Sequence, residues 1–113
     1  MKILYVGLIF LMQSPMLFIS SCAKDDGQSE LIAKGEIIFK STCKVCHAQG
    51  INGAPIVGNS KMWGERIKQG IPTLVEHATN GFNLMPAKGG NTELTSEEIS
   101  AAVTYMVEQV KSK

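Results

Sequence analysis

Cys43, Cys46 and His47 stand together in the segment CKVCH, and their types and spacing are those of a chemical site. The pattern C-x-x-C-H is the attachment site of c-type haem. Two thiols three positions apart on a helical turn reach the two vinyl groups of the porphyrin, and the next histidine points at the iron. The motif predicts one covalently attached haem c, with thioether bonds at Cys43 and Cys46 and His47 as the proximal iron ligand.

Three other uses of the same residues compete with haem. A zinc site needs four ligands, and beyond the motif the folded region offers only His77, without a second C-x-x-C or an H-x-x-x-H pair. A thioredoxin-like redox pair normally follows a strand in a β-α-β pattern, which the chain lacks. A structural disulfide between Cys43 and Cys46 would leave His47 unexplained. The residues favour haem, with a redox or structural thiol pair as the main alternative.

The elements that must position the motif are predicted to be helices. No segment shows strand alternation and no internal repeat is evident, so the predicted fold class is all-α. Four helices are predicted. The first covers 29–42 with Ser29 as N-cap, and the second covers 60–69, capped by Asn59 or Ser60. The third has Pro72 in its first turn and ends at Asn80-Gly81, and the fourth begins with a capping box of Thr95 and Glu98. The connections at 48–58 and 82–93 are long, and such loops in so small a domain usually serve a site.

Several further segments are similar to one known family. Gly35 and Phe39 precede Cys43 in a G-x-x-x-F-x-x-x-C spacing, and GINGAPIVGN, MWGERIKQG, ATNGFNLMPAKGG and ISAAVTYM follow the motif. Over about residues 31–110 the chain resembles the class I monohaem cytochromes c, and within them the c-five-type branch. The resemblance implies a small fold of about four helices wrapped around one covalently bound haem. It also implies that Gly35 lets the first helix cross the last one against an aromatic ring, here Tyr105.

The resemblance assigns further roles around the iron. Met85 is followed by Pro86 and matches the family's Met-Pro ligand, so Met85 is expected in the sixth position. Pro55 matches the residue whose carbonyl accepts the other ring N–H of the axial histidine. Some members of the branch have a cysteine after two glycines, where this chain has Asn91. That disulfide is therefore absent here, and the loop must be held by packing and hydrogen bonds.

The remaining methionines and the second histidine have simpler interpretations. Met62 and Met106 fall on helical stripes and are predicted to pack in the core. His77 would give bis-histidine ligation, but it sits in mid-helix and faces away from Leu74 and Ala78. We therefore expect His77 to be an exposed surface residue.

Four polar or aromatic residues are candidates for roles at the edge of the site. Trp63 and Arg66 lie one helical turn apart, where the indole N–H and the guanidinium would reach a haem propionate. The alternative for Trp63 is core filling, and the alternative for Arg66 is a solvated charge. Residues 34–88 hold seven basic and three acidic side chains, and Lys44 and Lys88 flank the two ligand segments. Both lysines would steer an acidic partner, although most surface lysines have no such role.

The N-terminal segment has the composition of an export signal. Residues 1–22 combine Lys2, an apolar run and small residues, which predicts a signal peptide, with a retained helical anchor as the weaker alternative. Cys22 ends a lipobox-like segment and is the expected lipidation site; ordinary cleavage after Ala23 is the alternative. Residues 23–29 are predicted to be a polar tether and 30–113 the cytochrome domain, which places the protein on the periplasmic side of the membrane.

Composition and charge limit the classes of function that the chain can have. All ten acidic residues and ten of the eleven basic ones follow residue 22, so the mature chain is formally neutral and nothing indicates nucleic-acid binding. Only four aromatics lie beyond residue 30, so a cofactor is expected to complete the core. Two axial ligands leave no open iron position, which predicts a one-electron carrier between redox proteins of a bacterial respiratory or periplasmic chain and not an enzyme. A haem catalyst or gas sensor with a labile Met85 and a non-haem thiol oxidoreductase are the alternatives.

Overall fold

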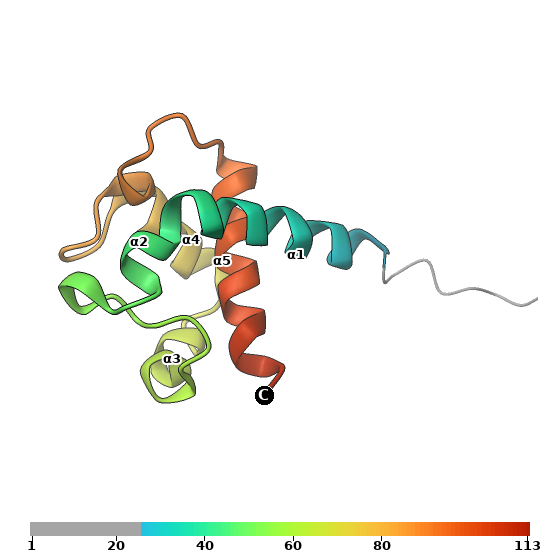
Figure 1. The fold of residues 1–113 in the computed structure, drawn as a ribbon, viewed down its shortest axis with the longest axis horizontal. Coiled ribbons are helices and arrows are strands. Elements are labelled where there is room, and N and C mark those ends of the chain that lie inside the picture. Colours follow the sequence, from blue (N-terminus) through green and yellow to red (C-terminus); the bar gives the residue numbers. More distant parts are fainter. Residues whose placement is uncertain (1–25) are drawn as a thin grey trace, which may run out of the picture.

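The computed structural model describes residues 26–113, which form helices joined by loops and short turns (Figure 1). This part of the chain has no strand, which confirms the all-α prediction. The five α-helices are α1 (Asp26–Ile38), α2 (Lys44–His47), α3 (Ser60–Ile67), α4 (Ile71–Asn80) and α5 (Ser96–Lys111). Three short turns complete the order: a π-helical turn η1 (Phe39–Cys43) and two 3-10 turns, η2 (Ile51–Gly53) and η3 (Ala87–Gly90).

The N-terminal helix begins earlier than predicted. α1 starts at Asp26, so the predicted N-cap Ser29 lies inside the helix and its hydroxyl donates to the Asp26 carbonyl at 2.9 Å. Residues 26–29, expected to be part of the tether, are therefore helical and exposed. The signal peptide, Cys22 and the first part of the tether lie outside the described residues. Over residues 26–113, none of the helices has the length and apolar character needed to cross a bilayer.

The crossing of α1 and α5 depends on Gly35. A Cβ built on Gly35 would lie 2.0 Å from the Ala101 carbonyl oxygen, far inside any real contact distance. The backbones therefore approach more closely at this point than any other residue type allows. One turn later, the rings of Phe39 and Tyr105 pack with their centroids 5.4 Å apart. The crossing expected from the resemblance is confirmed.

The later helices begin at the predicted signals. The Asn59 side chain accepts the Met62 amide at 3.0 Å and caps α3, and Pro72 lies in the first turn of α4. At the start of α5 the capping box is complete, because Thr95 Oγ1 accepts the Glu98 amide at 3.2 Å while Glu98 Oε2 accepts the Thr95 amide at 2.9 Å. These bonds satisfy amides that would otherwise lack partners at a helix N-terminus.

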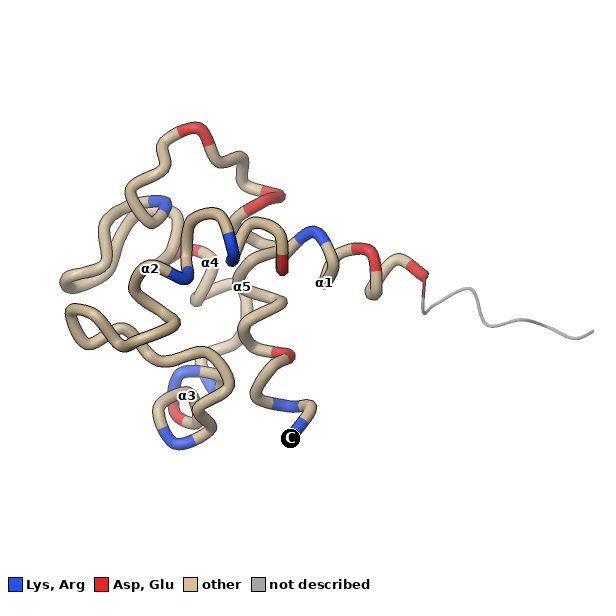
Figure 2. The backbone as a smooth tube through the Cα atoms, in the orientation of Figure 1, with Lys and Arg blue, Asp and Glu red and all other residues tan. Residues whose placement is uncertain are grey.

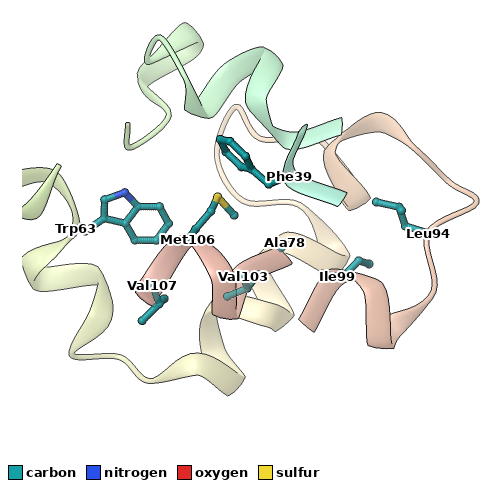
Figure 3. Packing of buried hydrophobic residues seen from close by; sticks show 8 residues of the cluster. All are labelled: Phe39, Trp63, Ala78, Leu94, Ile99, Val103, Met106 and Val107. Atoms are coloured by element: carbon teal, nitrogen blue, oxygen red, sulfur yellow. The ribbon is translucent and has the colours of Figure 1, made fainter. Parts of the chain in front are cut away.

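The hydrophobic core is a small cluster centred on α5 (Figure 3). Its buried residues come from the π turn, from α3, α4 and α5, and from the loop before α5. They are Phe39, Trp63, Ala78, Leu94, Ile99, Val103, Met106 and Val107. The predicted packing role of Met106 is confirmed, since it is 4% exposed. α5 therefore serves as the support against which the loops of the site are packed.

Candidate haem site

A cavity of about 480 Å³ opens where the two long loops meet α2, α3 and α4. The residues singled out for chemistry lie around it, although they come from distant parts of the chain: Cys43, Cys46, His47, Pro55, Met85 and Arg66. Trp63 and Met106 close its inner wall from the core. The fold therefore brings both predicted ligand segments to one open cavity of the size that proteins use to hold cofactors.

The π-helical turn η1 connects α1 to the cysteine motif. The helix does not end at Thr42, as expected, but widens over Phe39–Cys43 and then continues as α2 to His47. A π turn accommodates extra residues in the helical spiral and is frequent at functional sites. Here it leaves Phe39 buried while Thr42 and Cys43 line the cavity. No local signal in the sequence indicated this turn.

His47 is oriented by the loop that follows it. Its side chain is buried, and Nδ1 lies 2.9 Å from the Pro55 carbonyl oxygen. A carbonyl only accepts, so Nδ1 carries the proton and Nε2 keeps its lone pair, which is the tautomer that binds a metal. The Val57 amide also donates to the His47 carbonyl at 2.8 Å. The contact expected for Pro55 is present.

Met85 sits at the end of a tight hairpin. Its amide donates to the Phe82 carbonyl at 2.9 Å and its carbonyl accepts the Phe82 amide at 3.0 Å. Asn83 adopts a positive φ of 51° to make the turn. Gly81 must also be a glycine, because φ is +85° and a Cβ would meet the Met85 carbonyl at 3.0 Å. The thioether is half-buried, lines the cavity and packs against the core.

The two cysteines line the cavity and form no disulfide with each other. Burial raises the pKa of the Cys43 thiol above its ordinary value. Reactive redox cysteines have a lowered thiol pKa, because the thiolate is the nucleophile. The surroundings of Cys43 therefore disfavour the alternative of a thiol oxidoreductase.

Trp63 has a different partner from the one predicted. Its indole N–H donates to the Ile56 carbonyl at 2.8 Å, and the side chain is only 3% exposed. This bond holds the 48–58 loop and, with the burial of the ring, favours the alternative role of Trp63 in the core over contact with a propionate. Arg66 also lines the cavity and donates to the Met62 carbonyl from an exposed position. Its remaining N–H groups can still bind a carboxylate.

The expectation that His77 is an exposed surface residue is wrong. Its ring is half-buried and stacks on Phe82, with centroids 4.0 Å apart and planes inclined by 13°. Both rings line the cavity. The stacking follows from the turn of the chain at Gly81, which returns Phe82 over the last turn of α4, and helical periodicity carries no information on this.

The two lysines proposed to steer an acidic partner differ in exposure and in hydrogen bonding. Lys44 is exposed on α2. Lys88 is half-buried, and its ammonium donates to the carbonyls of Leu94 at 2.9 Å and Thr92 at 3.3 Å. Lys88 is therefore a structural donor and not a free surface charge. Figure 2 shows basic residues on α3, on α1 and at the end of α5, and acidic residues on the loop that enters α5.

Four exposed apolar side chains that line the cavity form an apolar rim, and sequence reasoning missed it. Its members are Val45 (64% exposed), Ile51 (43%), Phe82 (50%) and Leu84 (70%), and all four also line the cavity. Apolar side chains gathered at one place offer a surface to a group held in the cavity and to a partner protein. Val45 lies within C-x-x-C and Leu84 beside Met85, so their neighbours in the chain were the available signal.

Known proteins are similar to this chain in sequence and architecture. Residues 30–106 match the family model described as cytochrome c oxidase, cbb3-type, subunit III. Cytochrome c-555 of Prosthecochloris aestuarii is 38% identical over 95 residues, which cover 77% of this chain and 96% of the relative. Cytochrome c5 of Azotobacter vinelandii is 34% identical over 74 residues, which cover 64% and 89%. The chain belongs to this cytochrome family, as a class I monohaem cytochrome c of the c5 type.

A solved structure supports the same assignment. The cytochrome chain in a crystal structure of an electron transfer complex of nitrite reductase with cytochrome c is 34% identical, with a TM-score of 0.65. The match covers 68% of this chain and 94% of that one. As a c-type cytochrome, the protein carries one covalently bound haem c and transfers electrons; it is not an enzyme. The cavity fits this cofactor, because it combines two thiols, an imidazole with Nδ1 already bonded, and a thioether.

Proposed function

We propose that the protein is a one-electron carrier with a low-spin iron held between His47 and Met85 and with thioether bonds at Cys43 and Cys46. The observation that carries the proposal is the bond from His47 Nδ1 to the Pro55 carbonyl at 2.9 Å, in a cavity that Met85 also lines. It leaves Nε2 as the metal-binding nitrogen. The hairpin bonds between Phe82 and Met85 hold the thioether segment on the same cavity.

Filling both axial positions with side chains favours electron transfer over catalysis. No coordination position remains for oxygen, peroxide or a gas, and a thioether favours the ferrous state relative to a second imidazole. Arg66, which lines the cavity from α3, is the remaining candidate to bind a haem carboxylate through charge-assisted bonds. The alternative is a haem catalyst or gas sensor in which Met85 dissociates readily.

Optical spectra of purified wild type and two methionine variants test this proposal. We expect the wild type to show a low-spin c-type spectrum and to bind no carbon monoxide when reduced. Met85→Ala should become high-spin, bind carbon monoxide and have a lower reduction potential. Met62→Ala is the matched control, because Met62 is half-buried but does not line the cavity. Ready binding of carbon monoxide by the reduced wild type would favour the sensor or catalyst.

The apolar rim is the proposed point of electron exit. A redox protein that docks with an apolar face against Val45, Ile51, Phe82 and Leu84 would come close to the edge of the cavity. The solved relative was captured in a complex with nitrite reductase, which supports a redox protein as the partner class. Donor and acceptor are thus redox proteins of a bacterial respiratory or periplasmic chain.

The protein is proposed to work on the periplasmic side of the membrane, anchored by lipid at Cys22. Residues 1–22 have the layout of a lipoprotein signal, and only residues 23–25 separate Cys22 from α1. Three residues span at most about 11 Å, so the first turns of α1 would stand directly at the membrane surface. Mass spectrometry of the mature N-terminus distinguishes an acylated Cys22 from a free Lys24.

A further inference from the structure

Lys88 adopts a backbone conformation that is unfavourable for a residue with a side chain. Its φ is +56°, and it lies between Ala87 and two glycines that also have positive φ, Gly89 and Gly90. Residues with a Cβ avoid this left-handed region, and glycine adopts it freely. A third glycine would therefore fit the turn better, unless the lysine side chain contributes something that offsets the conformational cost.

The Lys88 side chain joins the Met85 loop to the start of α5. Its ammonium donates to the Leu94 carbonyl at 2.9 Å and to the Thr92 carbonyl at 3.3 Å. Leu94 is 8% exposed and belongs to the core cluster. One end of this connection is therefore firmly packed, and the other lies three residues after Met85. Hydrogen bonds with a charged donor are stronger than neutral ones.

Asn91 strengthens the same connection. Its amide donates to the Lys88 carbonyl at 3.1 Å, and its side-chain oxygen accepts the Glu93 amide at 3.2 Å. Its side-chain nitrogen lies 3.5 Å from Thr42 Oγ1 on the π turn, at the edge of hydrogen-bonding distance. Asn91 thus keeps the carbonyls that Lys88 contacts in a fixed turn.

We propose that Lys88 is a positioning residue for Met85: its ammonium fastens the loop 82–91 to the entry of α5 and keeps the thioether at the iron. The proposal rests on the proposed ligation by Met85. A thioether is a weak, neutral ligand, so the loop must hold it in place against competing molecules. When the fastening is lost, the loop opens more often, and an external ligand gains access to the iron in proportion to that opening.

Titration of the ferric protein with imidazole tests the proposal. Imidazole replaces a thioether ligand, so its apparent affinity measures how often Met85 leaves the iron, and absorption spectra follow the exchange. We expect Lys88→Gly to raise this affinity roughly tenfold, the equivalent of one charge-assisted hydrogen bond. Glycine suits the positive φ, so the variant removes the side chain without adding backbone strain. Lys88→Arg keeps a charged donor and should stay within about threefold of wild type.

The control is Lys61→Ala, which removes the same charge from an exposed position on α3 whose side chain makes no ion pair or hydrogen bond within residues 26–113. Far-UV circular dichroism shows whether each variant is folded. The proposal is overturned if Lys88→Gly binds imidazole with the affinity of the wild type. It is also overturned if the imidazole affinity of Lys88→Arg rises as much as that of Lys88→Gly. Failure of Met85 ligation itself is a separate result, since the wild-type spectrum would then lack the signature of thioether coordination.

Discussion

Replacing Gly35 with alanine tests the helix crossing on which the whole site is built. The new Cβ would lie 2.0 Å from the Ala101 carbonyl oxygen and 2.8 Å from the Cβ of Tyr105. Ordinary contacts of a Cβ begin at 3.4 Å, so α1 and α5 would have to separate by roughly 1 Å or more. Both obstacles belong to the backbone or lie next to it, and no change of rotamer removes them.

The size of the effect follows from two opposing terms. Overpacking costs about 1–3 kcal/mol and occasionally more, whereas alanine in a helix interior is favoured over glycine by up to about 1 kcal/mol. The clash with a fixed carbonyl places this site at the upper end of the first range. We therefore expect the free energy of unfolding to fall by about 2 kcal/mol, which lowers Tm by roughly 8–16 °C for a domain of this size.

Thermal unfolding of the haem-loaded protein, followed by circular dichroism, measures this change. Gly27→Ala is the matched control, because Gly27 lies on the same helix and a Cβ there meets nothing within 4 Å. We expect its Tm to equal or slightly exceed that of the wild type. Equal melting of Gly35→Ala and Gly27→Ala would refute the reasoning, since the crossing would then tolerate a Cβ at the closest approach.

Three further predictions concern the cap of α5, the indole and the surface charge. Thr95→Ala should lower the free energy of unfolding by about 1 kcal/mol through loss of the capping bond, while Ser96→Ala should leave it nearly unchanged; equal urea midpoints would contradict the cap. Trp63→Phe should destabilise the fold by about 1–3 kcal/mol, because it leaves a carbonyl acceptor unpaired, with little change in potential; a large change in potential with unaltered stability would restore the propionate role. Electron-transfer rates should fall with ionic strength, and Lys44→Gln should lower the low-salt rate more than Lys34→Gln; rates independent of salt would exclude steering.

Features set by a few consecutive residues were predictable. The capping box of Thr95 and Glu98, the cap at Asn59 and the proline in the first turn of α4 form where the sequence places them. Each depends on contacts within about one helical turn, so the residues themselves supply both partners. The expected role of Gly35 also holds, although only the distance to Ala101 explains why no other residue fits.

The start of α1 was misjudged because a polar composition does not exclude a helix. Residues 26–29 are exposed on every side, so no apolar stripe marks them, and the helix extends through them from the packed turns that follow. The π turn at Phe39–Cys43 was missed for a related reason. Its extra residue reconciles a buried Phe39 with cysteines that face the cavity, and this requirement exists only once α5 is in place.

By itself, the sequence determined the helices, the haem-binding motif and the family, because these depend on residue types at short, regular spacings. Tertiary structure alone decided three other contacts. The indole of Trp63 donates to the Ile56 carbonyl, the ammonium of Lys88 donates to two carbonyls before α5, and the ring of His77 stacks on Phe82. Hydrogen bonds and stacking act over about 3–4 Å, and the loops that bring such partners together carry no periodic signal.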